Sequence, residues 1–468
     1  MRRTRIVCTL GPSSTEPAVL RKMVLAGMDV ARLNFSHGDA ATHRRTVKLV
    51  RQVARSMGRH IALLQDLQGP KIRTGRLSEP LVRMVRGRRV TLTARDVVGD
   101  ETTIPVSHPE ICEAARKGDR VLLSDGMIEL RVVENLGEAA LCSVIRGGLL
   151  GERKGVTIPG RTLDLPALTD KDIADLQLGA ELGFDWVALS FVRTAEDINA
   201  CKRELEKLSW RVPVIAKLEK AEAIRNLKAI LGAVDGVMVA RGDLGVELAL
   251  GEVPAVQKDI IDRANRAGVP VITATEMLES MITSNRPTRA EASDVANAIW
   301  DGTDAVMLSA ETSTGAHPVD AVRAMARICV AAENHPSYVR ERPVWREDSL
   351  ASAIAHAAAQ VAGEVDADYI IAFTESGATA LRASKAHAPC AVITASPYQE
   401  VLRRSQLYSG VIPLHVPMGK DTDDMVDKAI RAGCESGVLK RGDRVILIAG
   451  VPVGKPGQTN MLKVETVA

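Results

Sequence analysis

Aromatic residues are scarce in this 468-residue chain: they make up 3% of it, although hydrophobic residues make up 46%. Net charge is also small, because 61 Lys and Arg residues are balanced by 58 Asp and Glu residues, which leaves +3. A protein that wraps a polyanion needs a strong positive field, and one that binds single strands needs aromatic platforms for the bases. We therefore expect no nucleic-acid partner.

Long apolar runs and paired cysteines are absent too. No run reaches the ~18 residues of a membrane span, and the N-terminal MRRTRIVCTLGPSS passes from basic residues straight into a strand-like run. The seven cysteines are odd in number, scattered and never spaced C-x-x-C, which is typical of reduced core thiols. These absences predict a soluble, cytoplasmic protein without membrane contact.

The chain is rich in short apolar runs that end in polar or charged residues and are separated by helix-length amphipathic stretches. Eight such runs occur, at residues 5–11, 28–36, 61–67, 185–191, 213–219, 235–243, 270–276 and 304–311. Eight strand-then-helix units predict a (β/α)₈ TIM barrel, in which the C-terminal strand ends converge on one site. The polar ends of these runs are therefore candidate site residues.

Two stretches depart from this rhythm. Residues 75–160 are too long for one barrel crossover and alternate like antiparallel hairpins between turn signals, which indicates an inserted small β-barrel lid domain. After about residue 345, an alanine-rich helix leads into four further strand-like runs. We therefore expect an α/β protein with a barrel at 1–74 and 161–345, the lid at 75–160, and an open C-terminal α/β regulatory domain at 346–468.

Charged side chains end the fifth and sixth predicted strands. Side chains two apart in a strand share a face, so Lys217 and Glu219 should point inward together, as should Arg241 and Asp243. Carboxylate oxygens from Glu219 and Asp243 suit an octahedral Mg²⁺ or Mn²⁺ that keeps water or substrate oxygens in its other positions. The sequence therefore predicts a divalent-metal site at this rim.

The second predicted strand, in ARLNFSHG, brings Arg32, Asn34 and Ser36 to one strand end by the same rule. An alternative is structural: Arg32 caps a helix and the other two close a turn. Thr275, at the end of the seventh predicted strand, also has two interpretations: it is either a site residue or an ordinary β-branched residue of the strand. The pattern alone does not separate these alternatives.

The predicted mouth combines three acids with four cations. The acids are Asp66, Glu219 and Asp243, and the cations are Arg32, Lys71, Arg73 and Lys217. This mixture suits a metal-bridged phosphate or carboxylate better than a neutral sugar, because a glycosidase needs a pair of unneutralised carboxylates. The sequence contains neither a P-loop nor a G-x-G-x-x-G fingerprint after a strand, so any nucleotide is held by other means.

The motifs resemble those of pyruvate kinases over essentially the whole chain. They are ARLNFSHG, DLQGPKIRTG, DLPALTDKDIADL, VIAKLEKAEAI, VMVARGDLGVE, ITATEMLESMI, PTRAEASDVANAIWDGTDAVMLSAET and FTESGATALR. The resemblance implies phosphoryl transfer from phosphoenolpyruvate to ADP, giving pyruvate and ATP in the last step of glycolysis. It also implies a homotetramer regulated by a phosphorylated metabolite.

The resemblance assigns roles at the rim. Glu219 and Asp243 would hold the divalent ion that bridges the substrate, and Lys217 would face the phosphoryl group in flight. Thr275 would lie near the methylene carbon that is protonated, with Arg73 among the catalytic residues near the phosphates. The substrate-binding set implied in this way is Arg32, Lys217, Gly242, Asp243 and Thr275.

Asn34, Ser36 and Asp66 match residues of the monovalent-cation pocket of the family. The resemblance also makes Asn34 and Arg73 nucleotide-binding residues. Many members carry a glutamate where this chain has Lys71, and those members need potassium. An ammonium in this position can stand where the ion would lie. We therefore expect the potassium-independent, bacterial type of the family, in which Lys71 fills the pocket and K⁺ is not required.

A second phosphate-type loop occurs in FTESGATALR. The hydroxyls of Thr374, Ser376 and Thr379, with the amides around Gly377, precede a helix and are suited to cradle a phosphate, although an ordinary capped turn would look the same. The resemblance makes this the effector site. The loop GVPVGKPGQTN lacks the Trp and Arg that hold fructose 1,6-bisphosphate in animal and yeast members, so we expect a monophosphate such as AMP or ribose 5-phosphate.

Two other functions fit parts of the sequence. Another metal-dependent phosphoenolpyruvate or enolate barrel would share the metal rim, but it predicts neither the inserted β domain nor a dependence on ADP. A catalytically silent metabolite sensor would use the third domain alone and would tolerate loss of Lys217, Glu219 or Asp243. All three are present.

Overall fold

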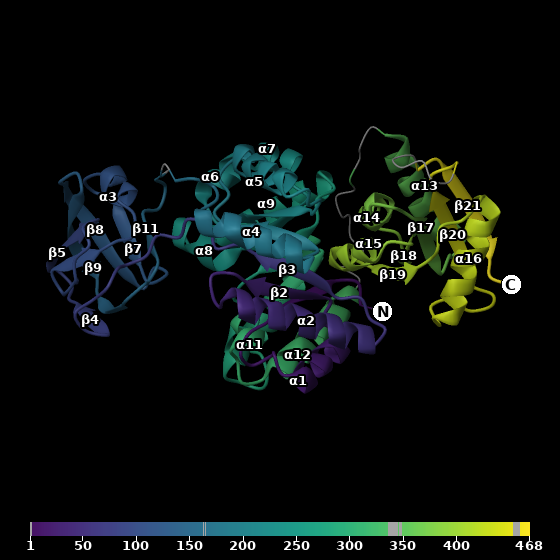
Figure 1. The fold of residues 1–468 in the computed structure, drawn as a ribbon, viewed down its shortest axis with the longest axis horizontal. Coiled ribbons are helices and arrows are strands. Elements are labelled where there is room, and N and C mark those ends of the chain that lie inside the picture. The colour runs from purple at the N-terminus through teal and green to yellow at the C-terminus, as the bar shows by residue number, and fades with distance from the viewer. Residues whose placement is uncertain (1, 162, 164, 336–344, 346–348, 453–458) are drawn as a thin grey trace.

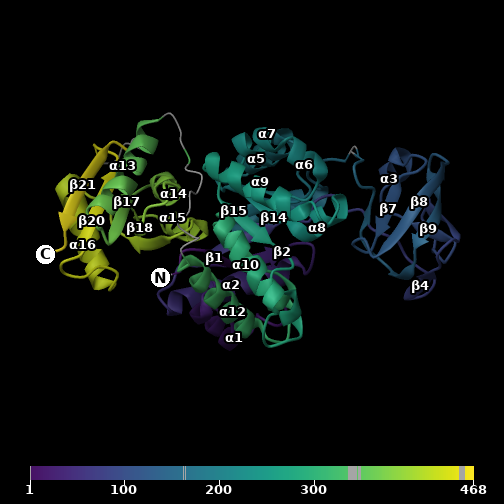
Figure 2. The ribbon, with the colours of Figure 1, turned by 180° about the vertical axis from the view of Figure 1, so that it is seen from behind.

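The computed structural model describes the chain except for residues 1, 162, 164, 336–344, 346–348 and 453–458. The barrel lies in the middle of an elongated molecule, with an inserted β domain at one end and the C-terminal α/β domain at the other (Figure 1). Seen from behind, the same order holds, so the two outer domains lie on opposite sides of the barrel (Figure 2).

The barrel is closed and wholly parallel, and it confirms the predicted fold class. Its strands follow the order β1-β16-β15-β14-β13-β12-β3-β2. They are β1 (Arg5–Thr9), β2 (Val30–Asn34), β3 (Ala62–Asp66), β12 (Trp186–Leu189), β13 (Val214–Leu218), β14 (Gly236–Ala240), β15 (Val271–Ala274) and β16 (Ala305–Leu308). Nearly every residue in these strands is buried, as expected for parallel strands covered on both faces.

Helices surround the barrel and alternate with its strands. They are α1 (Pro17–Ala26), α2 (Ala40–Ser56), α4 (Asp170–Leu182), α5 (Ala195–Lys207), α6 (Ala221–Arg225), α7 (Leu227–Ala233), α8 (Arg241–Glu247), α9 (Val253–Arg266), η1 (Glu279–Ile282), α10 (Arg289–Asp301), α11 (Ala310–Ser313) and α12 (Pro318–Glu333). Their ends follow local chemistry: α10 begins with a capping box between Thr288 and Glu291 and stops at left-handed Gly302.

The inserted domain lies between β3 and β12 in the chain. A six-stranded sheet has the order β11-β7-β8-β9-β5-β6, and a two-stranded sheet pairs β10 with β4. The elements are β4 (Leu81–Met84), β5 (Arg89–Thr93), β6 (Thr103–Pro105), α3 (Glu110–Ala114), β7 (Arg120–Leu123), β8 (Ile128–Asn135), β9 (Ala139–Arg146), β10 (Gly148–Gly151) and β11 (Val156–Thr157). Most pairs are antiparallel, as the alternation predicts, but β5 and β6 run parallel.

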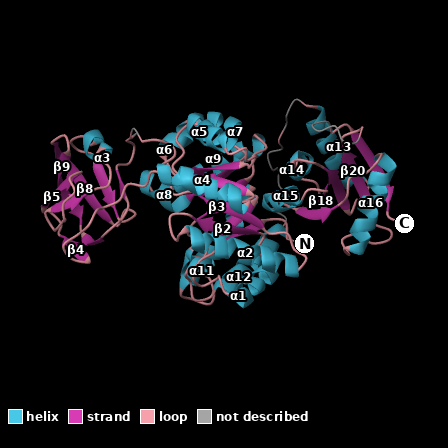
Figure 3. Cartoon of the chain, viewed as in Figure 1, coloured by secondary structure: helices cyan, strands magenta, loops and turns pink. Residues whose placement is uncertain are grey.

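The C-terminal domain is a five-stranded sheet of order β19-β18-β17-β20-β21 with helices packed on it (Figure 3). Its elements are α13 (Leu350–Glu364), β17 (Tyr369–Phe373), α14 (Ala378–Lys385), β18 (Ala391–Ser396), α15 (Gln399–Arg404), η3 (Ser405–Leu407), β19 (Val411–His415), α16 (Thr422–Glu435), β20 (Arg444–Ala449) and β21 (Met461–Thr466). The four predicted strands are present, and β21, antiparallel to β20, is an element that the sequence analysis missed.

The floor of the barrel is closed by this third domain. Trp186, at the start of β12, packs edge-to-face on Tyr408 with ring centroids 6.3 Å apart, and its indole N–H donates to the carbonyl of Arg404. Buried residues inside the barrel and in the C-terminal domain form one continuous apolar cluster. The open end of the barrel, where the strands finish, therefore faces the inserted domain.

All seven cysteines are free, and five of them are buried, which agrees with the prediction of core thiols. The prediction is wrong for the other two, because Cys390 is half-buried and Cys434 is exposed. Among the residues that the structure describes, no helix is long and apolar enough to cross a membrane.

Candidate active site

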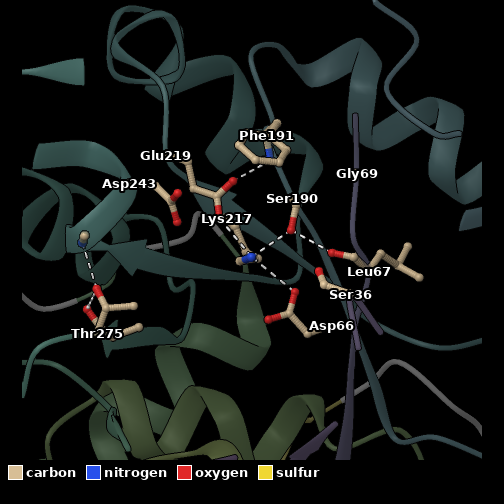
Figure 4. A network of polar contacts seen from close by, with 12 residues as sticks. Ser36, Asp66, Leu67, Gly69, Ser190, Phe191, Lys217, Glu219, Asp243 and Thr275 are labelled. Atoms are coloured by element: carbon tan, nitrogen blue, oxygen red, sulfur yellow. Dashed lines mark hydrogen bonds and ion pairs between the residues drawn. The ribbon is translucent and has the colours of Figure 1, made fainter. Parts of the chain in front are cut away.

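The ammonium of Lys217 is the centre of the polar network at the barrel mouth (Figure 4). Its nitrogen lies 2.8 Å from Glu219 Oε1 and 3.2 Å from Asp66 Oδ1, and it donates to Ser190 Oγ at 2.7 Å. Burial lowers the pKa of Lys217, but the charges of Asp66 and Glu219 outweigh it and hold the pKa above its ordinary range. Lys217 is therefore a fixed positive charge at any physiological pH.

Asp66 ends β3 and joins two cations below the rim. Its other carboxylate oxygen lies 2.6 Å from Arg32 Nε, and the Arg32 guanidinium also donates to Thr9 Oγ1 at 2.8 Å. Burial raises the pKa of Asp66, but Lys217 and Arg32 together outweigh it and lower that pKa. An ion pair thus holds Arg32 inside the barrel. The alternative interpretation, in which Arg32 caps a helix, is therefore wrong.

Glu219 follows β13 and is buried, with 1% of its side chain exposed. Its second oxygen accepts from the Phe191 amide at 2.8 Å. Burial raises the pKa of Glu219, Lys217 lowers it, and the neighbouring charge of Asp243 raises it further. Two carboxylates that repel each other at a solvent-facing cleft are a donor set that a hard divalent cation would stabilise.

The sixth barrel strand is shorter than predicted, which changes the geometry around Asp243. The prediction of one inward face for Arg241 and Asp243 is wrong, because β14 stops at Ala240 and both residues lie in α8. Arg241 instead forms an ion pair with Asp294 at 2.6 Å and donates to the Thr275 carbonyl. Asp243 is in the first turn of this helix and is about a third exposed.

Thr275 directly follows β15 in a left-handed conformation, with a φ of 64°. Its hydroxyl donates to the Ala274 carbonyl at 2.7 Å and accepts from the Gly242 amide at 2.8 Å. A β-branched residue in this region of φ/ψ space is strained, and such strain concentrates at functional sites. The structure therefore favours a specific role for Thr275 over ordinary strand filling.

The other residues predicted at the rim lie at the end of β2 and in the connection to the inserted domain. Asn34 is opposite Asp66 in the strand register. The prediction of one strand face for Arg32, Asn34 and Ser36 is wrong for Ser36, because β2 ends at Asn34 and Ser36 lies in the turn that follows. The Asn34 side-chain oxygen accepts from the Ser36 amide at 3.1 Å, as the turn-closing alternative expects for these two residues. Lys71 lies in the connection to the inserted domain, 3.8 Å from Asp243. Arg73 lies further along that connection, where its guanidinium donates to the Arg153 carbonyl at 3.0 Å.

The barrel and inserted-domain region matches the family described as "Pyruvate kinase, barrel domain" over residues 1–322, and the third domain matches "Pyruvate kinase, alpha/beta domain" over residues 352–465. The chain belongs to the pyruvate kinase family. Relatives include "Pyruvate kinase 2" of Synechocystis sp., 45% identical over 100% of this chain and 79% of the relative. Another is "Pyruvate kinase" of Mycobacterium intracellulare, 44% identical over 100% and 98%. The crystal structure of a pyruvate kinase from Cryptosporidium parvum matches with a TM-score of 0.93 and 34% identity, covering 100% of this chain and 96% of that one.

Membership of the pyruvate kinase family implies a divalent-metal requirement, and the residues present fit one. Among the described residues no group of three or more His, Cys, Asp or Glu side chains forms a complete metal cage. Glu219 and Asp243 supply only two carboxylates, which is the arrangement typical of Mg²⁺ bound jointly by protein and substrate phosphate. The site can thus hold a metal while leaving coordination positions for substrate.

A cleft between the barrel mouth and the inserted domain contains cations that the sequence analysis did not single out. Besides Lys71, Glu219 and Asp243, its lining includes Arg161, Arg193 and Lys220. Arg161 is held by a two-pronged ion pair with Asp119 of the inserted domain, at 2.8 and 2.9 Å. Sequence spacing gave no signal for it, because Arg161 follows the last strand of the inserted domain rather than a barrel strand.

The predicted effector loop is a tight turn before α14. Thr374 Oγ1 accepts from the Gly377 amide at 2.9 Å, and Gly377 has a φ of 93°, which glycine adopts without strain. Ser376 is exposed, whereas the hydroxyls of Thr379 and Thr459 bond to each other at 2.9 Å. Residues 453–458 of the loop GVPVGKPGQTN lie outside the described residues.

Proposed function

We propose that this protein transfers the phosphoryl group of phosphoenolpyruvate to ADP, giving pyruvate and ATP. The observation that carries the proposal is the Lys217 ammonium, held by Asp66 and Glu219 at the barrel mouth beside the carboxylate of Asp243. The transfer brings two polyanions together, so catalysis consists mainly of positioning and charge neutralisation. A buried lysine that stays charged is suited to that task.

Lys217 and Arg32 supply the positive charge on the barrel side. At ~4 Å and an effective dielectric constant of ~20, one ammonium stabilises a unit negative charge by about 4 kcal/mol. Lys217 faces the phosphoryl group during transfer, and Arg32, held by Asp66, binds the phosphate. Asn34 and Arg73 lie on the nucleotide side, where Arg73 is carried by the connection to the inserted domain.

Glu219 and Asp243 would hold Mg²⁺ or Mn²⁺, which when bound supplies Lewis-acid stabilisation of the enolate that leaves. Thr275 is a poor acid, so it orients the water that delivers the proton to the methylene carbon. Its bond from the Gly242 amide sets the position of that hydroxyl. The backbone around Gly242 and Asp243, at the start of α8, receives the substrate carboxylate.

The decisive experiment is a coupled assay for ADP-dependent formation of pyruvate from phosphoenolpyruvate. We expect the wild-type protein to be active, and Lys217→Met and Asp243→Ala to lose at least 100-fold in kcat. Lys202→Met is the matched control. Lys202 lies away from the mouth, where its ammonium forms an ion pair with Asp235 at a distance of 3.2 Å. Pyruvate formation without ADP would indicate another enolate enzyme, and retained activity in Lys217→Met would contradict the proposal.

We also propose that the protein is of the potassium-independent, bacterial type and that it works in the cytoplasm as a homotetramer. Lys71 supports the first proposal, since this chain has a cation where many members of the family carry a glutamate. Size-exclusion chromatography with light scattering tests the assembly, and a dimer or monomer at assay concentration would contradict it.

Regulation by a phosphorylated metabolite, AMP or ribose 5-phosphate, is proposed for the loop formed by Thr374, Ser376, Gly377 and Thr379. Its support is the exposed Ser376 hydroxyl next to the first residues of α14. We also propose that each domain has one role. Residues 1–74 and 161–345 carry out catalysis, residues 75–160 close over the barrel mouth, and residues 346–468 regulate the enzyme.

A further inference from the structure

Ser190 is the residue directly after β12, and its hydroxyl has two partners. It accepts from the Lys217 ammonium at 2.7 Å and donates to the Leu67 carbonyl at 2.7 Å. A serine hydroxyl has a single proton, so the bond to Leu67 fixes its orientation and turns a lone pair toward Lys217. Ser190 is 3% exposed, so no bulk water competes for these bonds.

The next residue continues this arrangement. Phe191 has a φ of 55°, which is rare for a bulky residue, and this conformation accompanies the hydrogen bond from its amide to Glu219 Oε2 at 2.8 Å. Gly69 makes room for the turn: a Cβ on Gly69 would come within 3.0 Å of Ser190 Cβ and 2.9 Å of the Phe191 ring. The end of β12 therefore contacts both Lys217 and Glu219 through adjacent residues (Figure 4).

The three acceptors around Lys217 differ in charge. Asp66 and Glu219 are carboxylates, which hold the ammonium strongly but also offset its charge. Ser190 is neutral, so it holds the nitrogen in place without offsetting its positive charge. A neutral anchor leaves more of the electrostatic attraction available for a transferring phosphoryl group.

We propose that Ser190 is a positioning residue for phosphoryl transfer: its hydroxyl, oriented by Leu67, fixes the Lys217 ammonium at the rim. The inference rests on the function proposed above, since Lys217 has its catalytic role only there. Misplacement of a reacting or stabilising group by 1 Å can cost ~10²-fold in rate. Loss of this anchor should therefore appear in kcat rather than in binding.

The test compares Ser190→Ala with Ser190→Thr, which keeps a hydroxyl, and with Ser405→Ala as a matched control. Ser405 is likewise buried, and its hydroxyl donates to the Leu402 carbonyl at 2.9 Å in the C-terminal domain. We expect Ser190→Ala to lower kcat roughly 10- to 100-fold with KM for ADP within 2-fold of wild type. Ser190→Thr should recover most of kcat, and Ser405→Ala should stay within 2-fold.

Two further measurements separate positioning from folding. Both variants should remain folded at the assay temperature in a thermal melt, although Ser190→Ala should lose more stability, because it loses the bonds to Leu67 and from Lys217 whereas Ser405→Ala loses one bond. In a Lys217→Arg background, Ser190→Ala should lower kcat much less than in the wild-type background, since a residue that acts through Lys217 gives a non-additive double-mutant cycle.

Each outcome bears on one hypothesis. A wild-type kcat in Ser190→Ala overturns the inference, as does an additive cycle or an equal kcat loss in Ser405→Ala. If Thr does not restore kcat while Ser190→Thr keeps wild-type thermal stability, the hydroxyl is not the positioning group. Full activity in Lys217→Met would instead remove the proposed function, independently of the result for Ser190.

Discussion

Lys71 and Asp243 both line the cleft, with the ammonium nitrogen of Lys71 3.8 Å from Asp243 Oδ1. Both side chains are about a third exposed, at 29% and 36%, so this contact is a weak, screened ion pair. Asp66 instead forms its ion pairs with Arg32 at 2.6 Å and with Lys217 at 3.2 Å. Lys71 thus adds a partly exposed positive charge beside Asp243, and the prediction that it fills the pocket at Asp66 is not met by an ion pair between the two in the described part of the chain.

This leads to a prediction about potassium. If Lys71 supplies the charge of the monovalent ion, as proposed above, the wild-type protein should be equally active in tetramethylammonium and potassium buffers. Lys71→Glu should lower activity at least 10-fold in tetramethylammonium, with recovery on addition of K⁺.

Initial rates over a range of K⁺ concentrations measure both effects. Lys48→Glu, the same charge change at an exposed position of α2, is the control and should be indifferent to K⁺. A several-fold stimulation of the wild-type protein by K⁺ would show that Lys71 does not replace the ion.

A second prediction concerns the buried charges below the rim. Asp66→Ala should lower the free energy of unfolding by about 3–5 kcal/mol, because it leaves Lys217 and Arg32 buried beside each other without their shared carboxylate. Chemical denaturation measures this change. Glu181→Ala, which removes an exposed partner of Arg44, should cost less than ~1 kcal/mol, and equal losses would contradict the argument.

A third prediction addresses the divalent metal. Removal of metal by EDTA should abolish activity, and Mg²⁺ should restore it. Glu219→Gln should weaken Mn²⁺ binding, followed by electron paramagnetic resonance without substrates, by 10-fold or more, because one of two anionic ligands becomes neutral. Glu291→Gln, at a carboxylate that caps α10, should bind Mn²⁺ like the wild-type protein. Unchanged Mn²⁺ affinity in Glu219→Gln would place the metal elsewhere.

The barrel was predictable because its signal is local. Each strand is a short apolar run with a polar end, and period-two alternation alone places Lys217 and Glu219 on the inner face. The contact between Lys217 and Asp66 also follows from the fold class, since strand ends of a parallel barrel meet at one rim. Local pattern and barrel closure together account for the centre of the site.

Residues placed by loops and helix starts were harder to predict. Asp243 reaches the mouth from the first turn of α8, so extending strand alternation through Arg241 gave a wrong face for that residue. The contact of Ser190 with Lys217 depends on close approach of Gly69, and the ion pair of Arg161 depends on the fold of the inserted domain. These contacts join segments distant in sequence, and residue spacing holds no information about them.

A fourth prediction tests the proposed effector loop. Ser376→Asp places a negative charge where a phosphate is expected, so it should abolish the response to AMP and ribose 5-phosphate while leaving the uninduced rate unchanged. Ser436→Asp, at an exposed position after α16, is the control. Initial rates against phosphoenolpyruvate concentration with and without each effector measure the response. A persisting response in Ser376→Asp would place the effector at another site.

The last prediction concerns the junction between the C-terminal α/β domain and the barrel floor. At the end of α14, the Lys385 ammonium lies 2.6 Å from Asp304 and 2.7 Å from Asn265, with 1% of its side chain exposed. Asp304 directly precedes β16 and also accepts from the Val271 amide at 2.8 Å. One buried ion pair therefore joins α14, the helix that follows the proposed effector loop, to the strands of the barrel.

Lys385→Met should lower the free energy of unfolding by about 3–5 kcal/mol and separate the melting of the C-terminal domain from that of the barrel in calorimetry, because it leaves Asp304 buried without its cation. Lys385→Met/Asp304→Asn should be more stable than the single variant. The second substitution removes the unpaired negative charge of Asp304, while the side-chain oxygen of the new asparagine can still accept the hydrogen bond from the Val271 amide. If the double variant is no more stable than Lys385→Met, the loss comes from packing around α14 rather than from the charge.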